Sequence, residues 1–341
     1  MGSISLSRGG LFSGWFGDCS FLILLPIVAI ASGAFVYFNP RYFELVFLLD
    51  LWLLGYHHVI ATYSRLLMDA GSRSRHLWLV SVLPLLVVVS VFALSKLAGS
   101  AAIATVYLYW QWFHYSRQSE GIAKAYLRKS KKAKGFDHVD TLCFYAVPLA
   151  AFIWMLSRGE SEFLFMPIWV LPVSDKLAFF ALLCAVPLGV VWLARRWVGW
   201  RTNEEPITLL LYGLGHYAIY LVAYVLIDQI NSGWLSINIW HNAQYIMFVW
   251  LFNQNRYRSG IEPGAKLISY LSQPGRGVIY FGFFVLVTYV VYSGIEVALD
   301  GYSAANVFEV AVIVYAAINF HHYIVDSLIW KLRKQSVSKY V

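Results

Sequence analysis

Repeated apolar runs constrain the fold of this chain more than any other feature. The first begins at Phe21, and comparable runs follow until shortly before the last residues. Each is about 18–25 residues long, enough to cross the hydrocarbon core of a bilayer as a helix. None shows the alternation with period two that is typical of strands in a membrane barrel. Because only helices and closed barrels satisfy their backbone groups in lipid, the sequence predicts an all-α, polytopic transmembrane helical bundle.

Composition supports this class, since 60% of the residues are hydrophobic and only 13% are charged. A soluble domain carries about 25% charged residues. We expect about ten spans, at 21–38, 42–64, 77–98, 100–123, 139–157, 176–194, 206–228, 235–255, 277–298 and 304–330. The short apolar stretch Phe163–Leu171 is flanked by prolines and is expected to be interfacial or re-entrant rather than an additional span.

The expected domain organisation follows from these runs. Residues 1–20 form a cytoplasmic N-terminal segment without a convincing cleavage site, so the run from Phe21 is expected to be a retained first helix. Residues 21–330 form a single transmembrane domain, and 331–341 form a basic cytoplasmic tail. No connection between the runs is long enough to fold as a soluble domain.

Basic residues predict the orientation of the bundle. Of the 26 Lys and Arg residues, 22 fall before the first expected helix, in the loops after even-numbered helices or in the tail. The other four are Arg41, Lys96, Arg158 and Lys176. Loops rich in Lys and Arg stay in the cytoplasm, so we expect both termini there, most simply in a bacterial-type inner (plasma) membrane. The net charge of +8 therefore reflects topology and does not indicate nucleic-acid binding.

The densest basic segment runs from Lys124 to Lys134. Ordinary orientation signals explain such a cluster, although anionic lipid headgroups or an acidic soluble partner would also be attracted to it. If the protein were a mono-oxygenase, a cytoplasmic electron donor is expected to dock at this segment, because the sequence contains no flavin, nicotinamide or iron–sulfur fingerprint.

Histidines are the best indication of function. Two of the nine, His76 and His138, lie in or beside expected cytoplasmic loops, and Asp137 or Asp140 is expected to cap the helix beginning near His138. The other seven fall inside expected helices: His57, His58, His114, His216, His241, His321 and His322. Polar side chains in hydrocarbon are costly and usually face the interior of the bundle.

The expected depth of the seven suggests one shared layer. Counting along the helices at 1.5 Å per residue places six of them in the cytoplasmic half of the membrane. His241 lies deeper and is the weakest candidate. Taken singly, His216 or His241 is as readily a hydrogen-bonded interior residue as a ligand, whereas the tandem pairs at 57–58 and 321–322 favour a functional site.

Polar neighbours at helical spacing strengthen several of these positions. Asp326 follows His322 by four residues and shares its face, so it is a candidate ligand. Asp50 lies seven residues before His57, and Gln118 lies four residues after His114. A carboxylate or amide one or two turns away can orient an imidazole that binds a metal.

Imidazole nitrogens suit iron, zinc and copper. Many histidines with few carboxylates favour non-haem iron, one ion or two, over zinc, because a single zinc needs only three or four ligands. The three cysteines have no metal-binding spacing. Haem b is disfavoured, because no helix carries two histidines at the separation of a membrane cytochrome.

Histidine pairs on several spans, gathered near one membrane face, resemble the integral-membrane non-haem iron oxygenases. These are the fatty-acid desaturase and hydroxylase group and the Brp/Blh-like carotene dioxygenases. The pairs His57-His58 and His321-His322 lack the upstream histidine of the desaturase boxes. The resemblance therefore implies only a class, O₂-dependent oxidation of a lipophilic substrate at iron.

Two other classes of function remain open. Intramembrane histidines with Asp50 could relay protons in a proton-coupled transporter. A lipid-modifying enzyme without a redox metal could use His114 with Glu120, or His322 with Asp326, as an acid–base pair.

Overall fold

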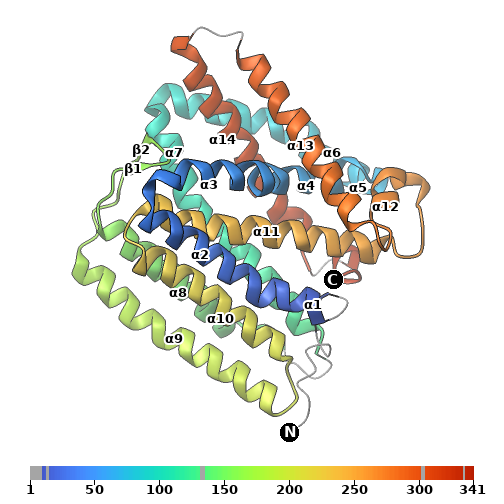
Figure 1. Cartoon of the computed structure of the whole chain (residues 1–341), viewed down its shortest axis with the longest axis horizontal. Coiled ribbons are helices and arrows are strands. Elements are labelled where there is room, and N and C mark those ends of the chain that lie inside the picture. Colours follow the sequence, from blue (N-terminus) through green and yellow to red (C-terminus); the bar gives the residue numbers. More distant parts are fainter. Residues whose placement is uncertain (1–9, 13–14, 131–134, 301–303, 333–334) are drawn as a thin grey trace. The chain divides into compact units, whose positions relative to one another are not determined.

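A computed structural model describes residues 10–12, 15–130, 135–300, 304–332 and 335–341 of the chain. Nearly all of these residues are helical, as expected (Figure 1). Contacts divide the chain into two compact units. Unit 1 comprises Met1–Phe47, Trp110–Leu164 and Val170–Gln244, and unit 2 comprises Leu48–Tyr109, Phe165–Trp169 and Tyr245–Val341.

Unit 1 contains the N-terminal helices and the middle of the chain. Its elements are α1 (Trp15–Cys19), η1 (Ser20–Leu24), α2 (Leu25–Phe38), η2 (Pro40–Tyr42), most of α3 (Phe43–Asp50), the second part of α7 (Leu83–Arg128), α8 (His138–Ser157), β1 (Glu162–Phe163), α9 (Asp175–Arg201), α10 (Ile207–Leu221), η4 (Val222–Leu226) and the first part of α11 (Ile230–Arg256). The consecutive helices α8, α9 and α10 lie side by side (Figure 1).

Unit 2 contains the stretch Leu48–Tyr109 and the C-terminal helices. Its elements are η3 (Leu51–Gly55), α4 (Tyr56–Leu67), α5 (Ala70–Arg75), α6 (Leu77–Ser81), the first part of α7, β2 (Met166–Pro167), the end of α11, η5 (Pro263–Ala265), α12 (Lys266–Leu271), α13 (Gly277–Leu299), α14 (Ala304–Ile329) and α15 (Gln335–Ser338). Helices α4, α13 and α14 pack on one another.

Eight helical segments among the described residues are long and apolar enough to span a membrane, which is the hallmark of an integral membrane protein. They include nine of the ten expected helices, because α7 covers two. At 46 residues, α7 would be about 69 Å long if it were straight, roughly twice the thickness of the hydrocarbon core. Its course breaks at Gly99 (φ 77°, ψ 179°), between the expected helices 77–98 and 100–123.

The remaining expected helix, 235–255, corresponds to α11, which is too polar to count among those eight segments. Its buried polar side chains are Ser232, Ser236, Asn238, His241, Asn242, Gln244 and Asn253. A helix with this content is compatible with a membrane only when protein surrounds it.

Residues Phe163–Leu171 form no helix, as expected. Strands β1 and β2 pair as a two-stranded hairpin, and the chain turns through Leu164 and Phe165 with φ of 47° and 64°. Positive φ at two successive residues is the geometry of the tight turns that join hairpin strands.

Residue His138 opens α8, and the expected cap is confirmed. The Asp137 side chain accepts from the Asp140 backbone N–H, and the Asp140 side chain accepts from that of Asp137. The Asp140 backbone N–H and the Arg195 guanidinium, at 3.0 Å, stabilise the Asp137 anion and hold the pKa of its carboxyl below its usual value.

Candidate metal centre

Two histidines of unit 2 face each other in its interior. His58 on α4 and His322 on α14 are both buried, and their Nε2 atoms lie 2.9 Å apart. The Nδ1 atom of His58 lies 2.8 Å from the backbone oxygen of Gly55. A carbonyl only accepts, so Nδ1 carries the proton of the neutral ring, and Nε2 presents its lone pair toward His322.

The π-helical turn η3, directly before α4, explains this orientation. It interrupts the α-helical hydrogen-bond pattern just before the tandem histidines. Two carbonyls of this turn form hydrogen bonds with the imidazoles: Leu53 O lies 3.3 Å from His57 Nδ1, and Gly55 O bonds to His58 Nδ1. Such single π-turns inside helices often mark functional sites.

Behind His322, a chain of hydrogen bonds leads away from the pair. The Nδ1 atom of His322 lies 2.8 Å from Thr62 Oγ1, which lies 2.7 Å from the hydroxyl of Tyr245. Tyr245 also accepts from the indole N–H of Trp330 at 2.8 Å. These contacts fix the plane of the His322 ring.

Unit 1 contains a second pair. His114 on α7 and His241 on α11 are buried, with ring centroids 4.9 Å apart. The ring of Tyr115 lies 4.0 Å from that of His241, and its hydroxyl donates to Asn238 at 2.6 Å. Tyr115 is thereby held against His241.

These four histidines form one group that could hold a metal ion. Ligand nitrogens of His58, His114, His241 and His322 all lie within 4.8 Å of one another, and all four residues are buried. Two nitrogens on opposite sides of one ion, each about 2.1 Å away, are about 4.2 Å apart. The upper limit of 4.8 Å is of the same order as this separation. Four buried imidazoles on apolar helices are compatible with a membrane metalloprotein.

The structure places the other three candidate histidines outside this group. His216 lies 2.9 Å from Ser119 Oγ through Nδ1 and 3.0 Å from Phe144 O through Nε2. His321 uses Nδ1 with the Tyr63 hydroxyl (2.6 Å) and Nε2 with Leu79 O (2.7 Å). Both rings use both nitrogens within the protein.

His57 differs from these two, because it bonds only through Nδ1. Its ring stacks on Phe284, with centroids 6.1 Å apart. Its Nε2 is buried without a hydrogen-bond partner in the described part of the chain.

The expected supporting residues Asp326, Gln118 and Asp50 also differ in how they relate to the four histidines. Asp326 is buried and is not one of the four grouped ligands. Gln118 donates to the backbone oxygen of His241 at 3.1 Å and so supports α11 beside that histidine. Asp50 is buried, but η3 lies between it and His57.

Sequence reasoning missed Thr62, Tyr245, Tyr115 and Asn238. Thr62 follows His58 by four residues, and Asn238 precedes His241 by three, so helical spacing could have identified both. Tyr245 and Tyr115 carry no distinguishing signal in the sequence, because the chain contains many tyrosines. Within the basic segment, Lys124 pairs with Glu120 at 2.6 Å, whereas Lys131, Lys132 and Lys134 lie outside the described residues.

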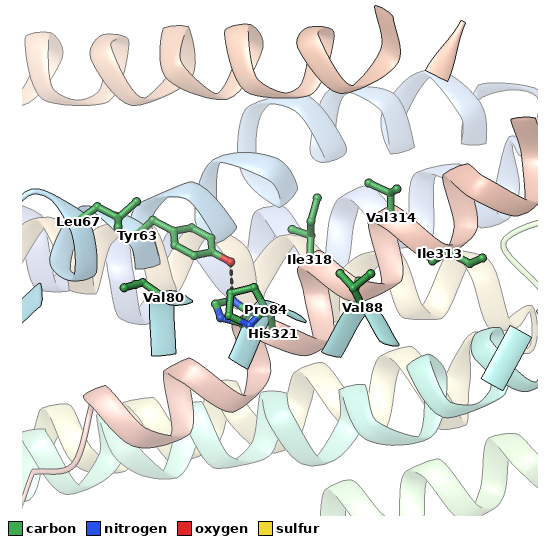
Figure 2. A pocket seen from close by; sticks show the side chains of 10 residues that line it. Tyr63, Leu67, Val80, Pro84, Val88, Ile313, Val314, Ile318 and His321 are labelled. Atoms are coloured by element: carbon green, nitrogen blue, oxygen red, sulfur yellow. Dashed lines mark hydrogen bonds between the residues drawn. The ribbon is translucent and has the colours of Figure 1, made fainter. Parts of the chain in front are cut away.

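An apolar cavity of about 240 Å³ lies beside His321 in unit 2 (Figure 2). Figure 2 shows His321 and the Tyr63 hydroxyl joined by their hydrogen bond, with aliphatic side chains of α14 such as Val314 and Ile318 along the cavity. Because His322 directly follows His321, the cavity and the grouped histidine lie on the same turn of α14.

Comparison of the chain with models of protein families, with curated proteins and with solved structures finds no match.

Proposed function

We propose that the protein is a membrane metalloenzyme that binds one non-haem iron ion through His58, His114, His241 and His322. With O₂, it oxidises a lipophilic substrate. The observation that carries the proposal is the buried group of four imidazoles. Two of the proposed ligands lie on helices of unit 2 (α4 and α14) and two on helices of unit 1 (α7 and α11).

The donor set supports a transition metal. Imidazole nitrogen suits iron, zinc, copper and nickel, whereas calcium and magnesium take oxygen ligands. The sequence expectation allowed one or two ions. We propose one, because four nitrogens meet the needs of a single ion. Four ligands also suit zinc, so the choice of iron rests on the resemblance to the membrane iron oxygenases and not on the number of histidines. When bound, iron would supply the O₂ binding and electron transfer that protein side chains lack.

The residues of the chain position the ligands and hold their protons. The bond from His58 Nδ1 to Gly55 directs the lone pair of Nε2 inward. For His322 to present its Nε2 lone pair as well, Nδ1–H must donate to Thr62, which can then donate to Tyr245. Donation from Nδ1–H to Thr62 would also make His322 Nε2 more basic.

The apolar cavity of Figure 2 supports a lipophilic substrate. In this proposal it receives an apolar chain from the lipid, lined by aliphatic side chains of α7 and α14. A mono-oxygenase would also require an electron donor, and the basic segment beginning at Lys124 is its proposed docking place. A cleaving dioxygenase would need none.

Two tandem histidine pairs provide matched tests. His58→Gln and His322→Gln remove proposed ligands, whereas His57→Gln and His321→Gln change their immediate neighbours. Metal content of the purified protein, measured by mass spectrometry, should fall at least tenfold in the first two variants and stay within about twofold in the others. Purified wild-type protein should contain one iron per chain, without the absorption of haem.

Equal metal content in all four variants, or no stoichiometric metal in wild type never exposed to chelator, would remove the proposal. A different bound metal lost from the same two variants would keep the site and change the chemistry.

A proton-coupled transporter is the second candidate. The continuous chain His58–His322–Thr62–Tyr245 favours it, because successive hydrogen bonds of 2.7–2.9 Å can pass protons. Uptake into proteoliposomes that follows a pH gradient and is abolished by Thr62→Val would support this function over the first.

A further inference from the structure

A second cavity, with a more polar lining, lies in unit 2. Its volume is about 420 Å³. Its lining includes three cationic residues, Arg65 at the end of α4, Arg75 at the end of α5 and Lys331 after α14. His76 and Ser336 add polar groups, and the lining contains no Asp or Glu.

Arg65 is the central observation. Its side chain is 5% exposed, and its guanidinium carbon lies 4.7 Å from the ring centre of Phe252 and 4.5 Å from that of Trp330. Two of its nitrogens, Nε and Nη1, are buried without a hydrogen-bond partner among the residues that the structure describes. Because these two nitrogens are enclosed by protein, they do not face the cavity, but the positive charge of the guanidinium lies at the cavity wall and favours an anion there.

Carboxylates near Arg65 do not supply that anion. Asp69, one turn later, accepts from the backbone N–H groups of Gly71 and Ser72 as the cap of α5 and is paired with Arg256. Within the described part of the chain, Arg75 and Lys331 have no ion pair either. The cavity thus combines three cations whose charge is not neutralised locally.

We propose that this cavity binds a phosphate group, and that the group belongs to the head of an anionic phospholipid. A phosphate offers several acceptor oxygens and matches the fork of a guanidinium that packs against two aromatic rings. The side chains of Leu77 and Trp78, on the helix that lines the cavity, are 59% and 50% exposed. These apolar side chains suit the glycerol and acyl region next to a headgroup. Basic pockets between membrane helices are known to take such headgroups. This inference does not rest on the proposed iron site.

The test uses the full-length protein in detergent, with native mass spectrometry and thermal unfolding as measurements. Three probes are compared: phosphatidylglycerol, phosphatidylcholine and inorganic phosphate. Because Arg65→Gln could prevent folding, the test variant is Arg75→Gln/Lys331→Gln. The matched control, Arg73→Gln/Lys339→Gln, removes the same charge from nearby positions that do not line the cavity.

Phosphatidylglycerol should bind and raise the unfolding temperature of wild type more than phosphatidylcholine does. The test variant should lose affinity by about fivefold for each charge removed, and the control should match wild type. If inorganic phosphate protects with the same dependence on Arg75 and Lys331 while lipid does not, the phosphate site stands and its ligand is soluble. Equal lipid binding by test and control variants, with no phosphate effect, would overturn the proposal.

Discussion

The hydrogen bond between His322 and Thr62 shows how residues around the histidine group support it. Thr62 Oγ1 lies 2.8 Å from His322 Nδ1 and 2.7 Å from the Tyr245 hydroxyl. A group that accepts from the outer nitrogen of a metal-binding imidazole fixes the ring and makes the inner nitrogen more basic. Loss of this acceptor should therefore weaken metal binding without removing a ligand.

Thr62→Val keeps the shape of the side chain and removes the hydroxyl. We expect metal affinity to fall by about 10- to 100-fold, measured by competition with a chromophoric chelator. Thr288→Val is the matched control, because Thr288 is equally buried and its hydroxyl has no partner in the described part of the chain. Equal affinities in the two variants would contradict a supporting role for Thr62.

Which histidines belong together could be predicted only in part. The tandem pairs pointed to the right helices, but two adjacent residues point about 100° apart on a helix, and sequence alone does not say which one faces inward. In the structure, one histidine of each tandem pair, His58 or His322, belongs to the four-histidine group. The other, His57 or His321, bonds to carbonyl or hydroxyl groups.

Helix boundaries differ from the expected ones around His241. The helix α11 begins at Ile230, before the expected start at residue 235, and ends at Arg256, so His241 lies close to its middle. Likewise, η3 adds the wider π-turn between Asp50 and His57, so the expected alignment of these two residues on one face is offset by about 100°. Periodicity cannot reveal such an insertion.

Close packing of α2 on α11 is an element-scale feature of unit 1. A Cβ atom added to Gly33 on α2 would lie 1.8 Å from Ser236 Oγ and 2.7 Å from the backbone oxygen of Ser232. Only glycine at this position permits the contact. Since His241 lies on α11, the same contact helps to define the position of that histidine.

Gly33→Val should force the two helices apart. We expect a loss of about 1–3 kcal/mol in the free energy of unfolding, seen as a lower unfolding temperature in detergent. Gly294→Val on α13 is the control, since a Cβ there meets nothing within 4 Å. If both variants unfold at the same temperature, the close approach of α2 and α11 does not contribute to stability.

At the scale of the whole molecule, the apolar runs predicted the helices well because each must satisfy its backbone within itself in lipid. Nine of the ten expected helices lie in the eight apolar segments, and the break in α7 falls at Gly99. The remaining expected helix, the polar α11, is the one that carries His241. The division into two contact units, by contrast, depends on which helices meet, and a run of apolar residues carries no such information.

The distribution of basic residues makes a prediction about orientation that the helices alone do not. Helix α8 is followed by only Arg158 before α9 begins at Asp175, whereas α9 ends with Arg195, Arg196 and Arg201. Under the positive-inside rule, the connection after α8 faces the exterior and that after α9 faces the cytoplasm. Alkaline phosphatase fused after Arg158 should therefore be active, and the same enzyme fused after Arg201 should be inactive. A fluorescent protein fused to the C-terminus should fold and emit in the cytoplasm.

This result would also place Lys331, and with it the proposed phosphate cavity, at the cytoplasmic leaflet, where anionic lipids attract basic groups. An active phosphatase after Arg201 together with a dark C-terminal fusion would invert the topology and remove that location for the cavity.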